Sequence, residues 1–276
     1  MASYRYVVCD VFTSTPLEGN QVAVFTDARE IPEAQLQRLA REMNFSETTF
    51  VYPPEGDGHV KMRIFTPNNE LPFAGHPTLG TAFVLAAPMQ LGEIRIETGR
   101  GIVPVRLERE GARIVFGWMT QPVPEFEPFV RADELLAALG AARTDLPIEY
   151  YSQGPGHTFV ELGSAEEVAA LSPDFKAVAA VTSGGAACFA RANGGWKMRV
   201  FVPGAGVPED PATGSAAGPL ALHLSRHGRI AFGEEIEISQ GAEIGRPSKL
   251  HAVAHDASRI DVGGSAVVVA RGEFRL

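Results

Sequence analysis

The sequence predicts an α+β protein with two similar halves, each a curved or closed sheet around one central helix. Strand-like segments outnumber helical ones, one short motif occurs twice, and a helix of small apolar residues follows each copy. A helix that is nearly free of charge must be buried on all sides, whereas a surface helix has a polar face. The surrounding strands are therefore expected to enclose both helices.

The repeated motif is a strand that ends at proline, followed by a polar residue directly before a second proline. The first copy spans residues 63–67 and 74–82, and the second spans residues 199–203 and 209–216. The polar residues, His76 and Asp210, are 134 residues apart in a chain of 276. A repeat at about half the chain length predicts two facing halves with a cleft between them.

The remaining elements follow from periodicity. Alternating apolar residues predict strands at 4–12, 21–26, 48–52, 59–65, 93–98, 102–109, 112–118, 148–152, 157–162, 186–191, 197–202, 234–239, 248–255, 258–263 and 265–275. Helical spacing predicts helices at 32–44, 77–87, 131–139 and 164–171, and another from the second motif to about Gly228.

Residues 121–130 contain three prolines and no periodicity, so they are the predicted linker. The first half is expected to comprise residues 1–120, with Glu47 and His76, together with the C-terminal strand 265–276. The second half is expected to comprise residues 121–264, with Asp210.

Composition excludes several classes of function. The net charge of −9 and pI near 5.3 argue against nucleic acid and anionic membranes as partners. No segment approaches the roughly 18 apolar residues of a membrane span, and no leader pattern is evident, so a cytoplasmic protein is expected. Cys9 and Cys188 lie in apolar strands and are expected to be buried free thiols.

Both motifs are expected to place proline at the first position of a helix, directly after His76 or Asp210. A helix start carries unpaired N–H groups and partial positive charge. Small residues at Gly75, Gly214 and Ser215 allow a ligand to approach this backbone. Two such helix starts would bind a carboxylate, although simple helix capping by Asp210 remains an alternative.

Glu47 is the candidate for proton transfer. It lies between Phe45 and Phe50, and apolar surroundings raise the pKa of a carboxyl group toward neutrality. The alternative is that Glu47 is solvated, like most of the 33 acidic residues.

No metal or cofactor is expected. His223 and His227 have helical spacing but lack the glutamate of a zinc-protease motif, so an exposed pair at a helix end is expected. No complete dinucleotide or Walker A fingerprint is present. Acid–base chemistry without a cofactor is the class that remains.

Segments 17–20 (LEGN), 45–50 (FSETTF), 69–77 (NELPFAGHP) and 209–218 (EDPATGSAAG) resemble the phenazine-biosynthesis isomerase family, PhzF. The resemblance covers the whole chain, including residues 240–248. It implies a fold like that of diaminopimelate epimerase, with two pseudo-symmetric halves. It also implies a homodimer without a cofactor.

The family's enzyme isomerises trans-2,3-dihydro-3-hydroxyanthranilate to a ketone precursor of the phenazine ring. The resemblance therefore implies a small cyclic amino/hydroxy carboxylate as the ligand and Glu47 as the residue that moves the proton. The implied substrate-binding residues are His76, Asp210, Gly75, Thr213, Gly214, Ser215, Asn20 and Ser46. Epimerase relatives carry two cysteines at the helix starts, so His76 and Asp210 in those places argue against a two-thiol racemase.

Two alternatives stay open at this point. The chain is either a PhzF-like isomerase or epimerase of another small carboxylate, or a binding protein that uses the same cleft without turnover.

Overall fold

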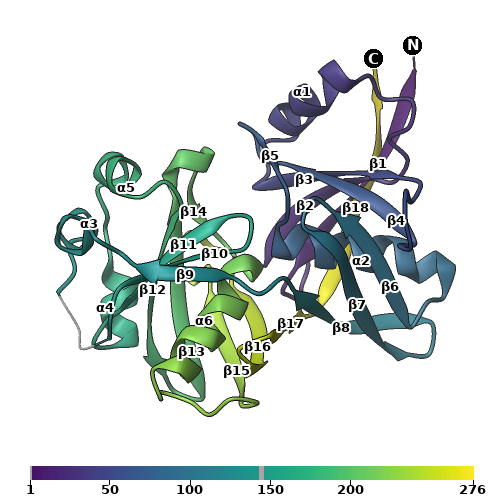
Figure 1. Ribbon diagram of the computed structural model, residues 1–276. Coiled ribbons are helices and arrows are strands. Elements are labelled where there is room, and N and C mark those ends of the chain that lie inside the picture. Colours follow the sequence, from purple (N-terminus) through teal and green to yellow (C-terminus); the bar gives the residue numbers. More distant parts are fainter. Residues whose placement is uncertain (1, 143–145) are drawn as a thin grey trace.

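Two lobes make up the molecule, and each surrounds one helix (Figure 1). The computed structural model describes residues 2–142 and 146–276, so residues 1 and 143–145 of the predicted halves lie outside the described residues. Helix α2 (Gly75–Met89) lies in the first lobe and α6 (Gly214–Arg226) in the second. All predicted strands and helices are present, with their ends shifted by at most three residues.

The first lobe is a sheet of strands in the order β18–β1–β2–β3–β4–β6–β7–β8, with β5 added to β4. Only β2–β3 and β4–β6 are parallel pairs. The strands are β1 (Ser3–Val11), β2 (Asn20–Phe25), β3 (Glu47–Tyr52), β4 (Val60–Phe65), β5 (Glu70–Leu71), β6 (Glu93–Thr98), β7 (Gly101–Glu110), β8 (Arg113–Gln121) and β18 (Ala266–Arg275).

The second lobe repeats this topology strand for strand. Its order is β9–β10–β11–β12–β13–β15–β16–β17, with β14 added to β13, and the parallel pairs are again β11–β12 and β13–β15. The strands are β9 (Glu125–Pro128), β10 (Glu149–Ser152), β11 (Gly156–Glu161), β12 (Gly185–Ala192), β13 (Gly195–Val202), β14 (Val207–Asp210), β15 (Glu235–Gln240), β16 (Ser248–Asp256) and β17 (Arg259–Gly264). The repeated motif thus marks a duplicated topology.

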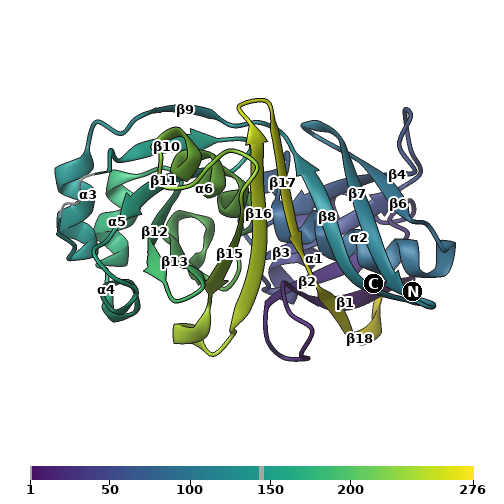
Figure 2. The ribbon, with the colours of Figure 1, turned by 90° about the horizontal axis from the view of Figure 1, so that it is seen from below.

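Strands β8 and β17 join the two lobes. They pair in antiparallel fashion from Gln121–Ile260 to Gly117–Gly264. Figure 2 shows β16, β17 and β8 running side by side through the middle of the molecule. The chain also returns to its beginning, because β18 pairs along β1 and places the two termini next to each other.

The prediction of an irregular linker at 121–130 is wrong in part. Strand β8 continues to Gln121, and residues Glu125–Pro128 form β9, which pairs with β10. Proline is compatible with this position because β9 is an edge strand, where a missing N–H costs no ladder hydrogen bond. The prediction also omitted the short strands β5 and β14 and the helix α5 (Phe175–Val181).

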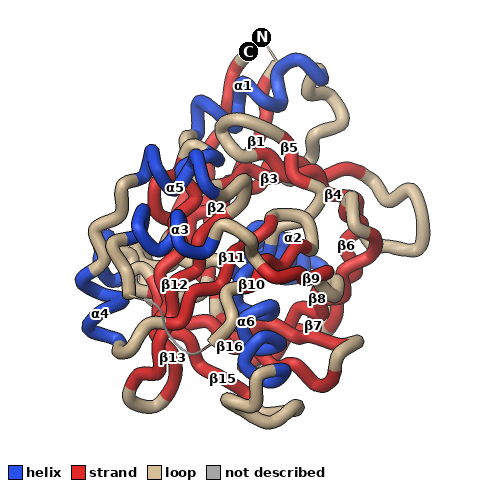
Figure 3. The backbone as a smooth tube through the Cα atoms, turned by 60° about the vertical axis from the view of Figure 1, so that its left-hand side comes forward, coloured by secondary structure: helices blue, strands red, loops and turns tan. Residues whose placement is uncertain are grey.

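The other helices lie outside the sheets. Helix α1 (Glu33–Met43) covers the first lobe, while α3 (Ala132–Leu139), α4 (Ala165–Ala170) and α5 gather on the outer side of the second (Figure 3). In α1 the predicted apolar face is buried at Leu36, Leu39 and Ala40. In contrast, α2 carries no charged residue and packs against β1, β2 and β8.

The first residue of each motif, Arg63 or Arg199, forms a salt bridge to the short strand that precedes the central helix of its lobe. Arg63 donates to Glu70 of β5 with 2.7 Å between Nε and Oε1. Arg199 donates to both carboxylate oxygens of Glu209 on β14, at 2.9 and 2.7 Å. These pairs hold the turn that leads into α2 or α6.

The expectation that Pro77 and Pro211 each begin a helix is wrong. Helix α2 begins at Gly75, so His76 and Pro77 are its second and third residues. Helix α6 begins at Gly214, Asp210 ends β14, and Thr213 takes the capping position. The Thr213 carbonyl accepts from the N–H groups of Ala216 and Ala217, so the chain needs three residues after Asp210 before it turns into the helix. The alternative reading of Asp210 as a helix cap therefore does not hold.

Two further expectations concern the cysteines and the membrane. Cys9 and Cys188 are buried free thiols, as predicted, and burial raises the pKa of each to about 12. Among the helices of residues 2–142 and 146–276, none has the length and apolar character needed to cross a membrane.

Candidate active site

The starts of α2 and α6 meet at the centre of the molecule. A Cβ atom on Gly75 would lie 2.6 Å from the carbonyl carbon of Gly214 and 2.7 Å from the backbone nitrogen of Ser215. Only glycine permits this backbone contact. The first N–H groups of both helices have no intrahelical acceptor, so two partially positive helix ends share one location.

A cavity of about 280 Å³ opens beside these helix starts. Eight of the nine predicted site residues line it: Ser46, Glu47, Gly75, His76, Asp210, Thr213, Gly214 and Ser215. The ninth, Asn20, does not line the cavity but donates a hydrogen bond to Asp210, which does. The volume lies just below the usual range for small-molecule sites, which suits a ligand with a single ring.

Glu47 is the first residue of β3, and its side chain is 15% exposed. Its Oε2 atom has no hydrogen-bond partner and lies 3.3 Å from Nε2 of His76. Burial, and then the negative charge of Asp210, raise the pKa of Glu47 well above the usual range of a glutamate. Glu47 is therefore a stronger base than an ordinary glutamate, and the solvated alternative does not hold.

His76 is neutral, and its tautomer follows from its partners. Asn20 Nδ2 lies 3.2 Å from Nδ1 and can only donate, so Nδ1 accepts and the ring proton is on Nε2. That proton is donated to the carbonyl oxygen of Gln21 at 3.2 Å. Burial lowers the pKa of His76 to about 4, although the charge of Asp210 acts in the opposite direction.

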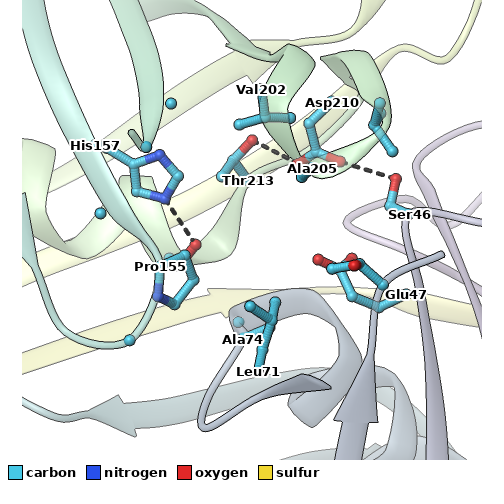
Figure 4. A pocket seen from close by; sticks show the side chains of 18 of the residues that line it. Ser46, Glu47, Leu71, Ala74, Pro155, His157, Val202, Ala205, Asp210 and Thr213 are labelled. Atoms are coloured by element: carbon cyan, nitrogen blue, oxygen red, sulfur yellow. Dashed lines mark hydrogen bonds between the residues drawn. The ribbon is translucent and has the colours of Figure 1, made fainter. Parts of the chain in front are cut away.

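Asp210 is held by donors from both lobes. Its Oδ1 accepts from Asn20 Nδ2 at 2.9 Å and from Ser46 Oγ at 3.0 Å, and its Oδ2 accepts from Thr213 Oγ1 at 2.6 Å. Figure 4 shows Ser46 and Thr213 bonded to Asp210, with Glu47 below them. Asn20, Ser46 and Thr213 thus fix a negative charge at one wall of the cavity.

A family model described as phenazine biosynthesis-like protein (PhzC-PhzF) matches residues 9–272. The chain belongs to this family. It is 50% identical over 277 residues to trans-2,3-dihydro-3-hydroxyanthranilate isomerase of Pseudomonas aeruginosa, with 99% of this chain and 100% of the relative covered. It is 49% identical to the protein of the same name from Pseudomonas fluorescens, with the same coverage.

Solved structures agree with membership of the PhzC-PhzF family. A PhzF-family protein of Bacillus anthracis has a TM-score of 0.87 at 27% identity, with 100% of both chains covered. A protein from Pseudomonas aeruginosa that is described as a predicted epimerase has a TM-score of 0.86 at 30% identity, with 98% of this chain and 99% of that one covered. A probable proline racemase from Agrobacterium radiobacter has a TM-score of 0.70 at 14% identity, covering 99% of this chain and 93% of that one. The predicted epimerase-like fold is confirmed.

Three glutamines that the sequence did not point to hold the start of α6. Gln121 and Gln153 donate to the carbonyl oxygens of Gly214 and Ser215, each at 2.9 Å. Gln240 donates to the Asp210 carbonyl at 2.7 Å and accepts from the N–H of Thr213 at 3.1 Å. Pro219 was a signal for one of these contacts, because it has no N–H to offer the Ser215 carbonyl one turn earlier.

His157 was also missed. It lines the cavity on the side of the second lobe, and its Nε2 lies 3.0 Å from Ser215 Oγ. Burial lowers the pKa of His157 to about 4, so the ring is neutral. No sequence pattern pointed to this residue, since it lies in an ordinary predicted strand outside both motifs.

The expectation of an exposed pair at His223 and His227 is wrong. The His223 side chain is fully buried, and both rings face Oε2 of Glu149 on β10, at 3.2 and 3.0 Å. These three residues are a group of metal-ligand type, with ligand atoms within 4.8 Å of one another. However, the guanidinium of Arg226 donates to the same Glu149 oxygen at 2.7 Å, so a cation already compensates this carboxylate. We assign the cluster to the structure of the second lobe.

Proposed function

We propose that this protein is an isomerase of trans-2,3-dihydro-3-hydroxyanthranilate in phenazine biosynthesis. Three curated relatives of 49 to 50% identity carry that enzyme's name, and 99% of this chain aligns with each. The observation that carries the proposal is the buried Glu47 carboxyl group, which faces a small cavity beside two helix starts. A homodimer, a cytoplasmic location and the division of the chain near residue 120 remain predictions.

The carboxylate of the substrate is placed at the two helix starts. The first backbone N–H groups of α2 and α6 have no intrahelical acceptor, and the helix dipoles favour negative charge there. When a proton leaves the diene ring, negative charge develops next to the same carboxylate. The helix starts therefore stabilise the transition state as well as the bound ligand.

Glu47 moves the proton. Its carboxylate removes a proton from one ring carbon, leaves the electron pair in the conjugated ring, and returns the proton to another ring carbon, so no oxidant or reductant is consumed. The raised pKa of Glu47 suits both the removal and the return of the proton. A carboxyl group with a low pKa would return the proton readily but would remove it slowly. No cofactor is needed for such a shift.

Asp210 and His76 orient the ring. The fixed carboxylate of Asp210 is placed to accept from the amino or hydroxyl group of the substrate. Neutral His76 adds no charge of its own, which preserves the raised pKa of Glu47 beside it.

The direct test is to incubate the purified protein with the dihydrohydroxyanthranilate in D₂O and follow the ring protons by NMR. We expect the substrate to be consumed, with at least partial deuterium incorporation at the receiving carbon, because the proton held by Glu47 exchanges with solvent after its removal from one ring carbon and before its return to the other. No consumption would refute the proposal. Tight binding without consumption would instead identify a binding protein, and turnover of a different ring carboxylate would identify a related isomerase.

The pH dependence of kcat is expected to report Glu47. Since the carboxylate form removes the proton, kcat should fall as the pH falls through the raised pKa of Glu47. Asp210 raises that pKa by its charge, so Asp210→Asn should move this acid limb to lower pH by about one unit. The pH at which kcat falls to half its maximum is measured independently of the maximal value of kcat.

The matched control for this profile is Asp57→Asn, which removes one negative charge from an exposed turn. Its acid limb should coincide with that of the wild type. An unshifted limb in Asp210→Asn would show that another group controls the profile.

A further inference from the structure

We infer that His157 fixes the direction of the Ser215 hydroxyl, so that the serine proton points at the ligand carboxylate. His157 is thus a positioning residue for the carboxylate site, acting through Ser215. The inference rests on the proposed function only in that it places a carboxylate at the helix starts. It applies equally to any ring carboxylate bound there.

The geometry places both residues at one wall of the cavity. Ser215 is the second residue of α6 and is 5% exposed, while His157 on β11 is 2% exposed. The bond between His157 Nε2 and Ser215 Oγ is 3.0 Å long. Figure 4 shows His157 on the opposite side of the cavity from Glu47, where a ligand would lie between them.

The environment of the ring determines its tautomer. His157 is neutral, so it carries one N–H. Its Nδ1 is buried without a hydrogen-bond partner, and a Cβ on Gly185 would come within 2.6 Å of this nitrogen. A proton on Nδ1 would therefore be a buried N–H without an acceptor, which proteins avoid more strictly than an unused acceptor. The proton is on Nε2, and His157 donates to Ser215.

The direction of this bond decides what Ser215 offers the ligand. Because Ser215 Oγ accepts from His157, its own hydrogen is free to be donated into the cavity. A hydroxyl that donates to a carboxylate adds a charge-assisted hydrogen bond to those of the helix N–H groups. Without His157 the hydroxyl can rotate away, and this preorganisation is lost.

Calorimetry with two probes tests the inference: anthranilate, which carries a ring carboxylate, and anthranilamide, its neutral counterpart. We expect His157→Leu and Ser215→Ala each to weaken anthranilate binding by about tenfold, the size of one charge-assisted hydrogen bond. The double variant should lose no more than either single variant. Binding of anthranilamide should change little in any of them.

The conservative variant separates positioning from packing. The side-chain amide of His157→Gln can donate to Ser215, so this variant should retain most of the affinity for anthranilate. In turnover, His157→Leu should raise KM by about tenfold with kcat nearly unchanged, because binding is lost equally in the ground and transition states. If His157→Leu does not fold, His157→Phe replaces it in the comparison of the single and double variants.

Additive losses of anthranilate affinity in the double variant would overturn the inference. So would an equal loss of affinity for anthranilamide, or binding of anthranilate by His157→Gln that is as weak as binding by His157→Leu. These outcomes are independent of the proposed activity. Wild-type protein that binds anthranilate but leaves the dihydro compound unchanged would refute the activity alone.

Discussion

Glu47→Gln is expected to lower kcat by at least about a hundredfold, which is the lower limit of what a positioned acid–base group contributes. The glutamine side chain keeps the shape of Glu47 but cannot accept and return a proton. It also removes a buried carboxyl group that has no hydrogen-bond partner at Oε2, so folding should be unimpaired. Stopped-flow or steady-state turnover measures the loss.

Binding of anthranilate to Glu47→Gln should stay within about threefold of wild type, because the helix starts and not Glu47 hold the carboxylate. Glu42→Gln is the control, since Glu42 is an exposed glutamate at the end of α1. Turnover by Glu47→Gln near the wild-type rate would exclude Glu47 as the residue that moves the proton.

Gly75→Ala should have the second large effect. The added Cβ would lie 2.6 to 2.7 Å from the backbone of Gly214 and Ser215, distances that real Cβ atoms do not show. The two helix starts must then separate by a fraction of an ångström or more. A displacement of about 1 Å in a positioned site can cost about a hundredfold in rate, and we expect kcat/KM to fall by that amount.

The same substitution should destabilise the fold by about 1 to 3 kcal/mol, as overpacking of a core does. Urea unfolding measures this term separately from kcat/KM. Gly92→Ala is the matched control, because an added Cβ at this exposed glycine has no atom within 4 Å. If Gly75→Ala were as active and stable as the control, the helix starts would not need their close contact.

The duplicated architecture was predictable because its signals are local. Strand alternation, the prolines that end β4 and β13, and the apolar character of α2 can each be recognised within one short segment. The exact start of α6 was not predictable in the same way. Asp210 does not cap the helix but accepts from Ser46 and Asn20 of the other lobe, and no local pattern reveals contacts over such a separation.

The residues that were missed act across long separations in the chain. His157 and Gln153 meet Ser215 although 58 and 62 residues separate them, and no spacing rule connects such positions. His223 and His227 illustrate a related limit. Their helical spacing was recognised, but only the packing of β10 against α6 decides that Glu149 covers them.

The return of β18 to β1 has a consequence for how the protein is made. Residues Ala266–Arg275 leave the ribosome after every strand of the second lobe, yet they pair with Ser3–Val11. The second lobe consists of contiguous strands from Glu125 to Gly264 and is complete before that strand emerges. The first lobe is synthesised first but lacks β18, so one edge of β1 stays unpaired until that strand emerges. An unpaired strand edge is prone to aggregation. Vectorial synthesis therefore favours a folding order opposite to the order of translation, and the cleft that contains Glu47 is completed last.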